Sequence, residues 1–82
     1  MKVVVDSSAI LSILFAEPNS DDILVAISSN SCVISAGNYL ETAIVVDSTK
    51  NPITIRKFDE LIKEAEIEIL PTGIAIFNLE NP

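Results

Sequence analysis

The sequence predicts an α/β fold in which a short parallel sheet packs against helices. Short apolar runs, such as Lys2–Val5 and Cys32–Ile34, alternate with longer stretches whose apolar residues recur at helical spacing. The predicted order is strand, helix, helix, strand, helix, helix, strand. Strands separated by helices pair in parallel through right-handed crossovers. The 82 residues are enough for one small domain.

The first half of the chain predicts one strand and two helices. Lys2–Val5 is apolar without alternation, which is typical of a strand buried on both faces of a sheet. We expect Ser7 or Ser8 to cap the first helix, and Asn19 or Ser20 to cap the second. The apolar positions expected to face the core are Ala9, Ile10, Ile13 and Leu14 in the first helix, and Ile23, Leu24, Ala26 and Ile27 in the second.

The second half predicts two strands and two further helices. Cys32–Ile34 is the second strand, Ser35 caps the third helix, and Pro52 suits the first turn of the fourth. Glu66–Leu70 alternates and predicts a third strand near a sheet edge. Gly73–Leu79 is expected to form a short helix. The expected buried faces are Ala36, Tyr39, Leu40, Ala43 and Ile44 in the third helix, and Ile55, Phe58, Leu61, Ile62 and Ala65 in the fourth.

Composition limits the function classes. Twelve acids against five bases give a net charge of −7, which disfavours non-specific nucleic-acid binding through a basic surface. Cys32 is the single cysteine, so no intrachain disulfide forms, and we expect a small buried side chain in a reducing cytoplasm. We expect no signal peptide, because an acid already stands at position 6. Ala9–Ala16, the longest apolar stretch, is interrupted by Ser12 and too short to span a membrane.

Two acids are candidates for a metal site. Asp6 follows the first strand, and Glu41 lies two turns into the helix after the second strand, with Asn38 three residues earlier on the same face. Ligands of open parallel sheets gather beyond the carboxyl ends of the strands. Acids from adjacent strand–helix units can converge there on Mg²⁺ or Mn²⁺, which activates water and stabilises charge on a phosphodiester.

Several alternatives stay open on the residues alone. Asp6 is equally placed to cap the following helix, and Glu41 to face solvent. Ser7 and Ser8 are either caps or contacts of the site and of a substrate phosphate. A serine hydrolase is disfavoured because the chain has no histidine, and a phosphate-binding loop because it has only two glycines. A receiver-like domain phosphorylated near Asp6 would need a second acid beside it, which is missing.

Two segments together resemble a known family. VVVDSSAILSILFAEPNSDDIL, followed by ISAGNYLETAIVV, resembles the PIN-domain family, and in particular the VapC-type toxins of bacterial toxin–antitoxin pairs. The resemblance covers Met1 to about Pro71. It includes the strand–Asp–Ser–Ser–Ala opening, the Glu-Pro break, the Ile-Ser-Ala start of the third helix and the Leu-Glu within it.

The resemblance implies a metal-dependent endoribonuclease that uses Mg²⁺ or Mn²⁺ held by a cluster of acids. By motif position, Asp6 corresponds to the first catalytic, metal-binding acid and Glu41 to the second. Ser7 matches a small hydroxyl residue that lines the site, and no catalytic role is transferred to Asn38. The resemblance also implies a PIN-like three-layer fold, an antitoxin protein as partner, RNA as substrate, a homodimer and no membrane.

The chain departs from this family after its third expected strand. Family members continue with a third acid, a fourth strand that pairs with the first, and often a fourth acid; Glu80 is not assigned to that role. We therefore expect residues 1–82 to be a single, partial PIN-like domain, the N-terminal part of the full fold. The alternative function is a catalytically inactive remnant that only binds an antitoxin or self-associates. An unpaired edge on the first strand would favour a dimer or a partner.

Overall fold

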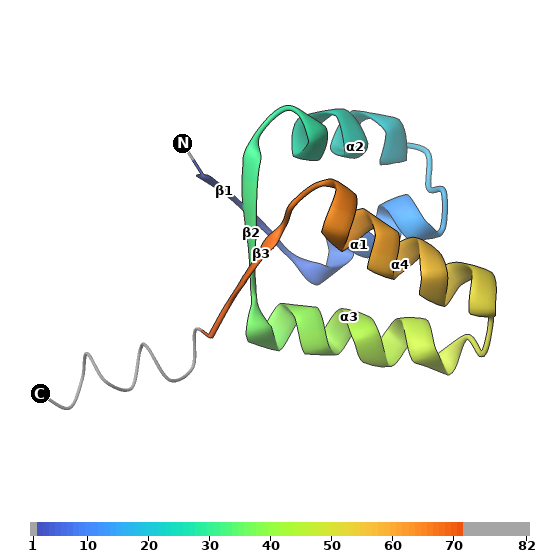
Figure 1. Cartoon of the computed structure of the whole chain (residues 1–82). Helices are drawn as coiled ribbons and strands as arrows, with labels where there is room; N and C mark the ends of the chain where they lie inside the picture. Colours follow the sequence, from blue (N-terminus) through green and yellow to red (C-terminus); the bar gives the residue numbers. More distant parts are fainter. Residues whose placement is uncertain (1, 72–82) are drawn as a thin grey trace, which may run out of the picture.

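The computed structural model describes residues 2–71, and in that range it has the predicted order of elements (Figure 1). The expected helix over Gly73–Leu79 lies outside the described residues. None of the described helices is long and apolar enough to cross a membrane. The elements are β1 (Lys2–Val5), α1 (Ser7–Leu14), α2 (Ser20–Ser28), β2 (Ser31–Ser35), α3 (Ala36–Ser48), α4 (Pro52–Glu64) and β3 (Glu68–Leu70).

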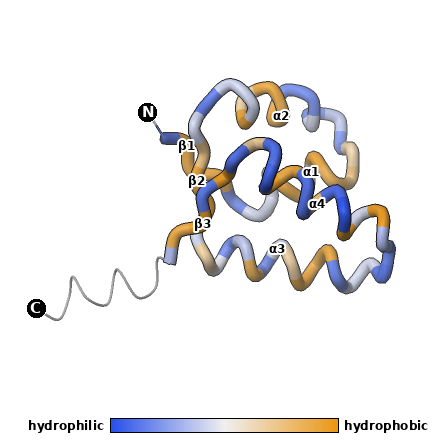
Figure 2. The backbone as a smooth tube through the Cα atoms, viewed as in Figure 1, coloured by the Kyte–Doolittle hydropathy of each residue, from blue (hydrophilic) through white to orange (hydrophobic). Residues whose placement is uncertain are grey.

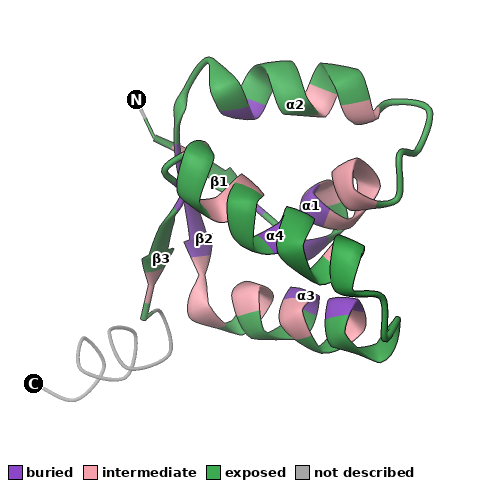
Figure 3. Cartoon of the chain, turned by 45° about the vertical axis from the view of Figure 1, so that its right-hand side comes forward, coloured by how far each residue is buried: buried purple, intermediate pink, exposed green. Residues whose placement is uncertain are grey.

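The strands form a parallel sheet in the order β1-β2-β3, which confirms the predicted α/β class. Val5 pairs with Ile34, and Ile34 pairs with Ile69. Both crossovers advance in the same direction across the sheet, so right-handed connections put both helix pairs on one face. Figures 1 and 3 show this arrangement, with all four helices on the same side. Residues 2–71 thus form two layers, the sheet and one layer of helices, where three layers were expected (Figure 1).

The hydrophobic core lies between this sheet and the helices. Ile10 of α1 and Ile34 of β2 are completely buried, and the Phe58 ring of α4 lies 5.4 Å from that of Tyr39 of α3. Figure 2 shows apolar segments along β1, β2 and parts of each helix. Cys32 is buried as expected, and desolvation raises the pKa of its thiol. The core residues are Val5, Ile10, Ile27, Cys32, Ile34, Val46, Phe58 and Ile67.

The predicted buried face of α3 is wrong in part. Leu40 and Ile44 are 60% and 61% exposed, whereas Thr42 and Val46 are buried. The Thr42 hydroxyl donates to the carbonyl of Asn38 at 2.7 Å. A hydroxyl satisfied within its own helix can be buried at little cost, so the helix turns this small side chain inward. Hydrophobicity alone therefore did not distinguish the exposed Leu40 and Ile44 from the residues of α3 that face the core.

The buried faces of α2 and α4 are narrower than predicted. In α2 only Ile27 is buried, and Leu24 is 39% exposed. In α4 Phe58 is buried, but Ile55 is 41% exposed. The remaining contacts come from half-buried side chains such as Ile23 and Leu61. Each helix thus packs mainly through one large residue.

Ser35 caps α3 as predicted, because its hydroxyl accepts from the amide of Asn38 at 3.0 Å. Pro52 lies in the first turn of α4 as predicted, and Asn51, for which no cap was predicted, caps this helix by accepting from the amide of Ile53 at 2.9 Å. Asn19 occupies the capping position of α2 without a side-chain hydrogen bond to that helix. Asp21 and Asp22 lie in the first turn of α2, where negative charge is favoured.

Lys50 follows α3 with a positive φ of 56°, a conformation that favours glycine. We expect Lys50→Gly to raise the free energy of unfolding by about 0.5–1 kcal/mol, because it removes the left-handed strain of a residue with a Cβ. Lys57→Gly, in the exposed middle of α4, is the control and should lower it by about 1 kcal/mol. Urea denaturation measures both. Equal decreases in the free energy of unfolding of the two variants would contradict the assignment of strain to Lys50.

Candidate active site

Asp6 lies at the carboxyl end of β1 and is the N-cap residue of α1. Its Oδ1 accepts a hydrogen bond from the Ala9 amide at 3.0 Å and another from the Ser8 hydroxyl at 2.9 Å. The prediction that Ser7 or Ser8 caps this helix is therefore wrong. The extended backbone of Asp6 brings its carboxylate over the first turn, so both serines fall inside the helix.

These hydrogen bonds also fix the charge of Asp6. The Ala9 amide, and after it the Ser8 hydroxyl, lower the pKa of the Asp6 carboxyl from its ordinary value. The carboxyl is consequently ionised throughout the neutral pH range. A metal ligand has to be deprotonated, so this environment keeps Asp6 in the form that binds a cation.

A hydrogen bond from Ser7 connects the start of α1 to Glu41. The Ser7 hydroxyl donates a hydrogen bond to Oε1 of Glu41, which lies 34 residues later on α3. Ser7 is only 8% exposed, whereas Glu41 is exposed. The bond ties the first turn of α1 to the side of α3. It places Glu41 against Ser7, the residue that directly follows Asp6 in the chain.

Asn38 takes part in the structure of α3 through its main chain. Its amide donates to Ser35 and its carbonyl accepts from Thr42. Within residues 2–71, no hydrogen bond joins Asn38 to Asp6 or Glu41. Glu80 lies outside the described residues.

The donor set fits a hard divalent cation. Neither Oδ2 of Asp6 nor Oε2 of Glu41 accepts a hydrogen bond from residues 2–71. Mg²⁺ commonly binds through one or two carboxylates, keeps several waters and takes further oxygens from a substrate phosphate. Two oxygen ligands without sulfur or imidazole suit Mg²⁺ or Mn²⁺ better than Zn²⁺. Across residues 2–71, no three acids, cysteines or histidines are grouped closely enough to hold a metal.

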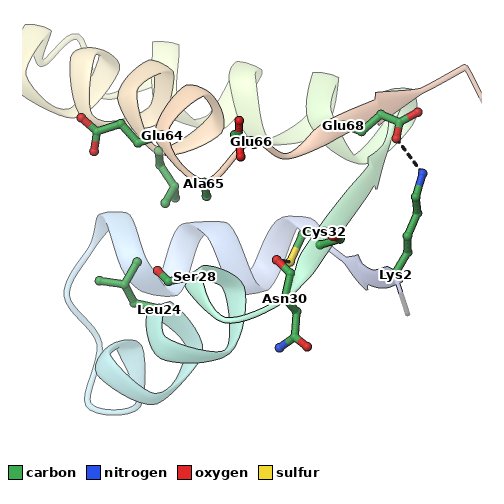
Figure 4. A pocket seen from close by; sticks show the side chains of 11 residues that line it. Lys2, Leu24, Ser28, Asn30, Cys32, Glu64, Ala65, Glu66 and Glu68 are labelled. Carbon is green, nitrogen blue, oxygen red and sulfur yellow. Dashed lines mark hydrogen bonds and ion pairs between the residues drawn. The ribbon is translucent and has the colours of Figure 1, made fainter.

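A separate pocket of about 560 Å³ lies at the other end of the sheet (Figure 4). Two of its lining residues, Lys2 and Glu68, form an ion pair of 2.9 Å between Nζ and Oε1 where β1 and β3 begin (Figure 4). Asp6 follows the opposite end of β1. This pocket is consequently not a part of the candidate site.

The sequence predicts Ser8 as a helix cap or as a contact of the site and of a substrate phosphate, without naming its partner. In the structure that partner is the Asp6 carboxylate. The signal was present as the Asp-x-Ser spacing, because short polar side chains two residues apart at a helix start readily bond to each other.

A family model and curated relatives match this chain. A family model described as PIN domain matches residues 3–79. VapC ribonuclease Mb0625 of Mycobacterium bovis and ribonuclease VapC28 of Mycobacterium tuberculosis are each 42% identical to the chain over 71 residues. Each alignment covers 84% of this chain and 53% of the relative, so the chain spans about half the length of these curated relatives. The matches support the VapC-type resemblance over a receiver-like domain, and the chain belongs to the PIN-domain family.

Proposed function

We propose that the chain acts as a VapC-like toxin, a metal-dependent endoribonuclease of a type II toxin–antitoxin pair in the cytoplasm. The observation that carries the proposal is the Ser7 hydrogen bond that joins the Asp6 end of β1 to Glu41 of α3. The similarity to two proteins named as VapC ribonucleases supports the reaction class. RNA is the substrate, and the partner is an antitoxin protein.

In this proposal Asp6 and Glu41 hold Mg²⁺ or Mn²⁺ through their outward carboxylate oxygens. A divalent cation bound there supplies Lewis acidity toward the phosphodiester and lowers the pKa of water. Asp6 contributes a fixed negative charge at the end of β1. Ser7 keeps Glu41 turned toward the same helix start. These residues bind and orient, while the RNA brings its own phosphate oxygens.

The charge of the protein supports a requirement for metal. With a net charge of −7, the chain repels the RNA backbone at long range. Two exposed carboxylates at the site strengthen that repulsion locally. A divalent cation between the acids and the phosphate reverses it, so we expect cleavage to stop when the cation is chelated.

The test is cleavage of a fluorescent single-stranded RNA by the purified chain with Mg²⁺ or Mn²⁺, and with excess chelator. We expect Glu41→Gln to lower the rate by at least about 100-fold, since even partners outside the first ligand shell cost 10–100-fold. Glu60→Gln, at an exposed position of α4, is the matched control and should cleave normally. Wild-type rates in Glu41→Gln would contradict the proposed role of this acid.

A second candidate function is a PIN-domain remnant that only binds an antitoxin or self-associates. The observation that favours it is the absence of a third grouped acid from residues 2–71. Two carboxylates alone give a weakly pre-organised site. This candidate predicts capture of the antitoxin in a pull-down without RNA cleavage under any metal condition, whereas the toxin predicts both activities.

We further propose that the chain forms a homodimer through the outer face of α3. Leu40 and Ile44, one turn apart on α3, are 60% and 61% exposed, and adjoining exposed apolar side chains mark an interaction site better than a single one does. We expect Leu40→Lys with Ile44→Lys to convert the dimer to a monomer in sedimentation. Val25→Lys, at a 64% exposed position on α2, should leave the dimer intact. A wild-type chain that sediments as a monomer would refute the dimer.

A further inference from the structure

The two oxygens of the Asp6 carboxylate differ in their hydrogen bonds. The carboxylate's two shortest hydrogen bonds, from the Ala9 amide and the Ser8 hydroxyl, are made to the same oxygen, Oδ1. Within residues 2–71, Oδ2 receives no hydrogen bond. Oδ1 thus serves the helix start. A helix cap and a cation ligand are therefore compatible roles for one carboxylate.

Ser8 is not needed for capping. The Ala9 amide already satisfies the capping bond that Asp6 provides, and the Ser8 hydroxyl is an exposed side chain that adds a second donor to the same atom. A hydrogen bond from a hydroxyl to an ionised carboxylate is stronger than one between two neutral groups. Its consequence is geometric, because two donors on Oδ1 restrict the rotation of the carboxylate and so fix the direction of Oδ2.

The two consecutive serines, Ser7 and Ser8, each donate a hydrogen bond to a different acid. Ser7 donates to Glu41 on α3, and Ser8 donates to Asp6 at the end of β1. Consecutive residues in a helix point about 100° apart, so adjacent positions can serve two different partners. The Asp-Ser-Ser sequence at residues 6–8 therefore carries one ligand and one orienting hydroxyl for each acid.

We propose that Ser8 is a positioning residue that holds Asp6 as a monodentate cation ligand through Oδ2. The proposal deepens the proposed function and rests on it. Ser8 does not touch the cation. Its hydroxyl donates to Oδ1 together with the Ala9 amide, which leaves Oδ2 as the oxygen available to Mg²⁺ or Mn²⁺. Losing this hydroxyl frees the carboxylate to rotate and weakens cation binding, while the Ala9 bond keeps α1 capped.

The test is a titration of the purified full chain with Mn²⁺, followed by electron paramagnetic resonance of the free ion, with the far-UV circular dichroism and Tm recorded in parallel. We expect Ser8→Ala to raise the Kd for Mn²⁺ about tenfold, with Tm nearly unchanged, and Ser8→Thr to restore the wild-type Kd. Ser12→Ala is the matched control: it removes a serine–carboxylate bond of 2.8 Å to Glu17 next to the same helix and should not change the Kd.

The outcomes separate this inference from the function on which it rests. A wild-type chain that binds Mn²⁺ and cleaves RNA, with an unchanged Kd in Ser8→Ala, overturns only the role of Ser8. Failure of Ser8→Thr to restore Mn²⁺ binding also overturns the role of Ser8, because the weaker binding of Ser8→Ala would then not come from loss of the hydroxyl. A wild-type chain without Mn²⁺ binding overturns both proposals.

Discussion

Replacing Asp6 by Asn is expected to lower RNA cleavage by at least about 100-fold, because it removes an anionic ligand whose loss costs no less than that of an outer partner. The fold should survive the change. Asn caps helices as well as Asp does, and its amide oxygen can still accept from the Ala9 amide and the Ser8 hydroxyl. The measurement is the single-turnover cleavage rate with saturating Mn²⁺, with circular dichroism as the check on folding.

Asp22→Asn is the matched control for this prediction. Asp22 is an exposed acid in the first turn of α2, so the control makes the same chemical change at another helix start. It should cleave at the wild-type rate. Equal rates in Asp6→Asn and wild type would mean that Asp6 only caps α1, and equal losses in both variants would indicate a general effect of charge.

Phe58→Ala is expected to destabilise the domain by about 3–5 kcal/mol, the usual cost of deleting a buried phenyl ring. Phe58 is 6% exposed, and its ring lies 5.4 Å from that of Tyr39 between α3 and α4. Small domains have little stability to lose, about 5 kcal/mol at the lower end of the usual range. We therefore expect only about 0–2 kcal/mol of stability to remain, so the variant should unfold at a much lower urea concentration than the wild type, as followed by far-UV circular dichroism.

Phe15→Ala tests whether this effect depends on burial. Phe15 stands at the end of α1 and is 46% exposed, so truncating it removes fewer contacts. We expect Phe15→Ala to lower the free energy of unfolding by less than about 1.5 kcal/mol, which is half the lower estimate for a buried ring. If the midpoints of urea unfolding of the two variants coincide, the assignment of Phe58 to the core is wrong.

The order and type of the elements could be predicted because they depend on local periodicity. β1, β2 and the four described helices appear where the apolar spacing placed them. The third strand is shorter than Glu66–Leu70, since Glu66 has a positive φ of 54° and ends the connection from α4. Which side of α3 is buried could not be predicted, because Thr42 satisfies its hydroxyl within the helix, and a hydropathy pattern does not register this.

The site was predictable in part for a similar reason. Asp6 follows β1 directly, so its place at the end of the sheet follows from the strand alone. The bond between Ser7 and Glu41 joins positions 34 residues apart and depends on how α1 packs beside α3. The cap was misassigned because Asp, Ser and Ser in succession all suit a helix start, and only the backbone at Asp6 decides among them.

The central claim is that Asp6 and Glu41 hold one cation together, and a double-mutant cycle on Mn²⁺ binding tests it most directly. The wild-type chain, Asp6→Asn, Glu41→Gln and the double variant are titrated with Mn²⁺ under identical conditions. A shared site predicts that each single variant loses most of the binding and that the double variant loses little more, so the effects are strongly non-additive. Losses that simply add, or single variants that bind as wild type does, would contradict a common site.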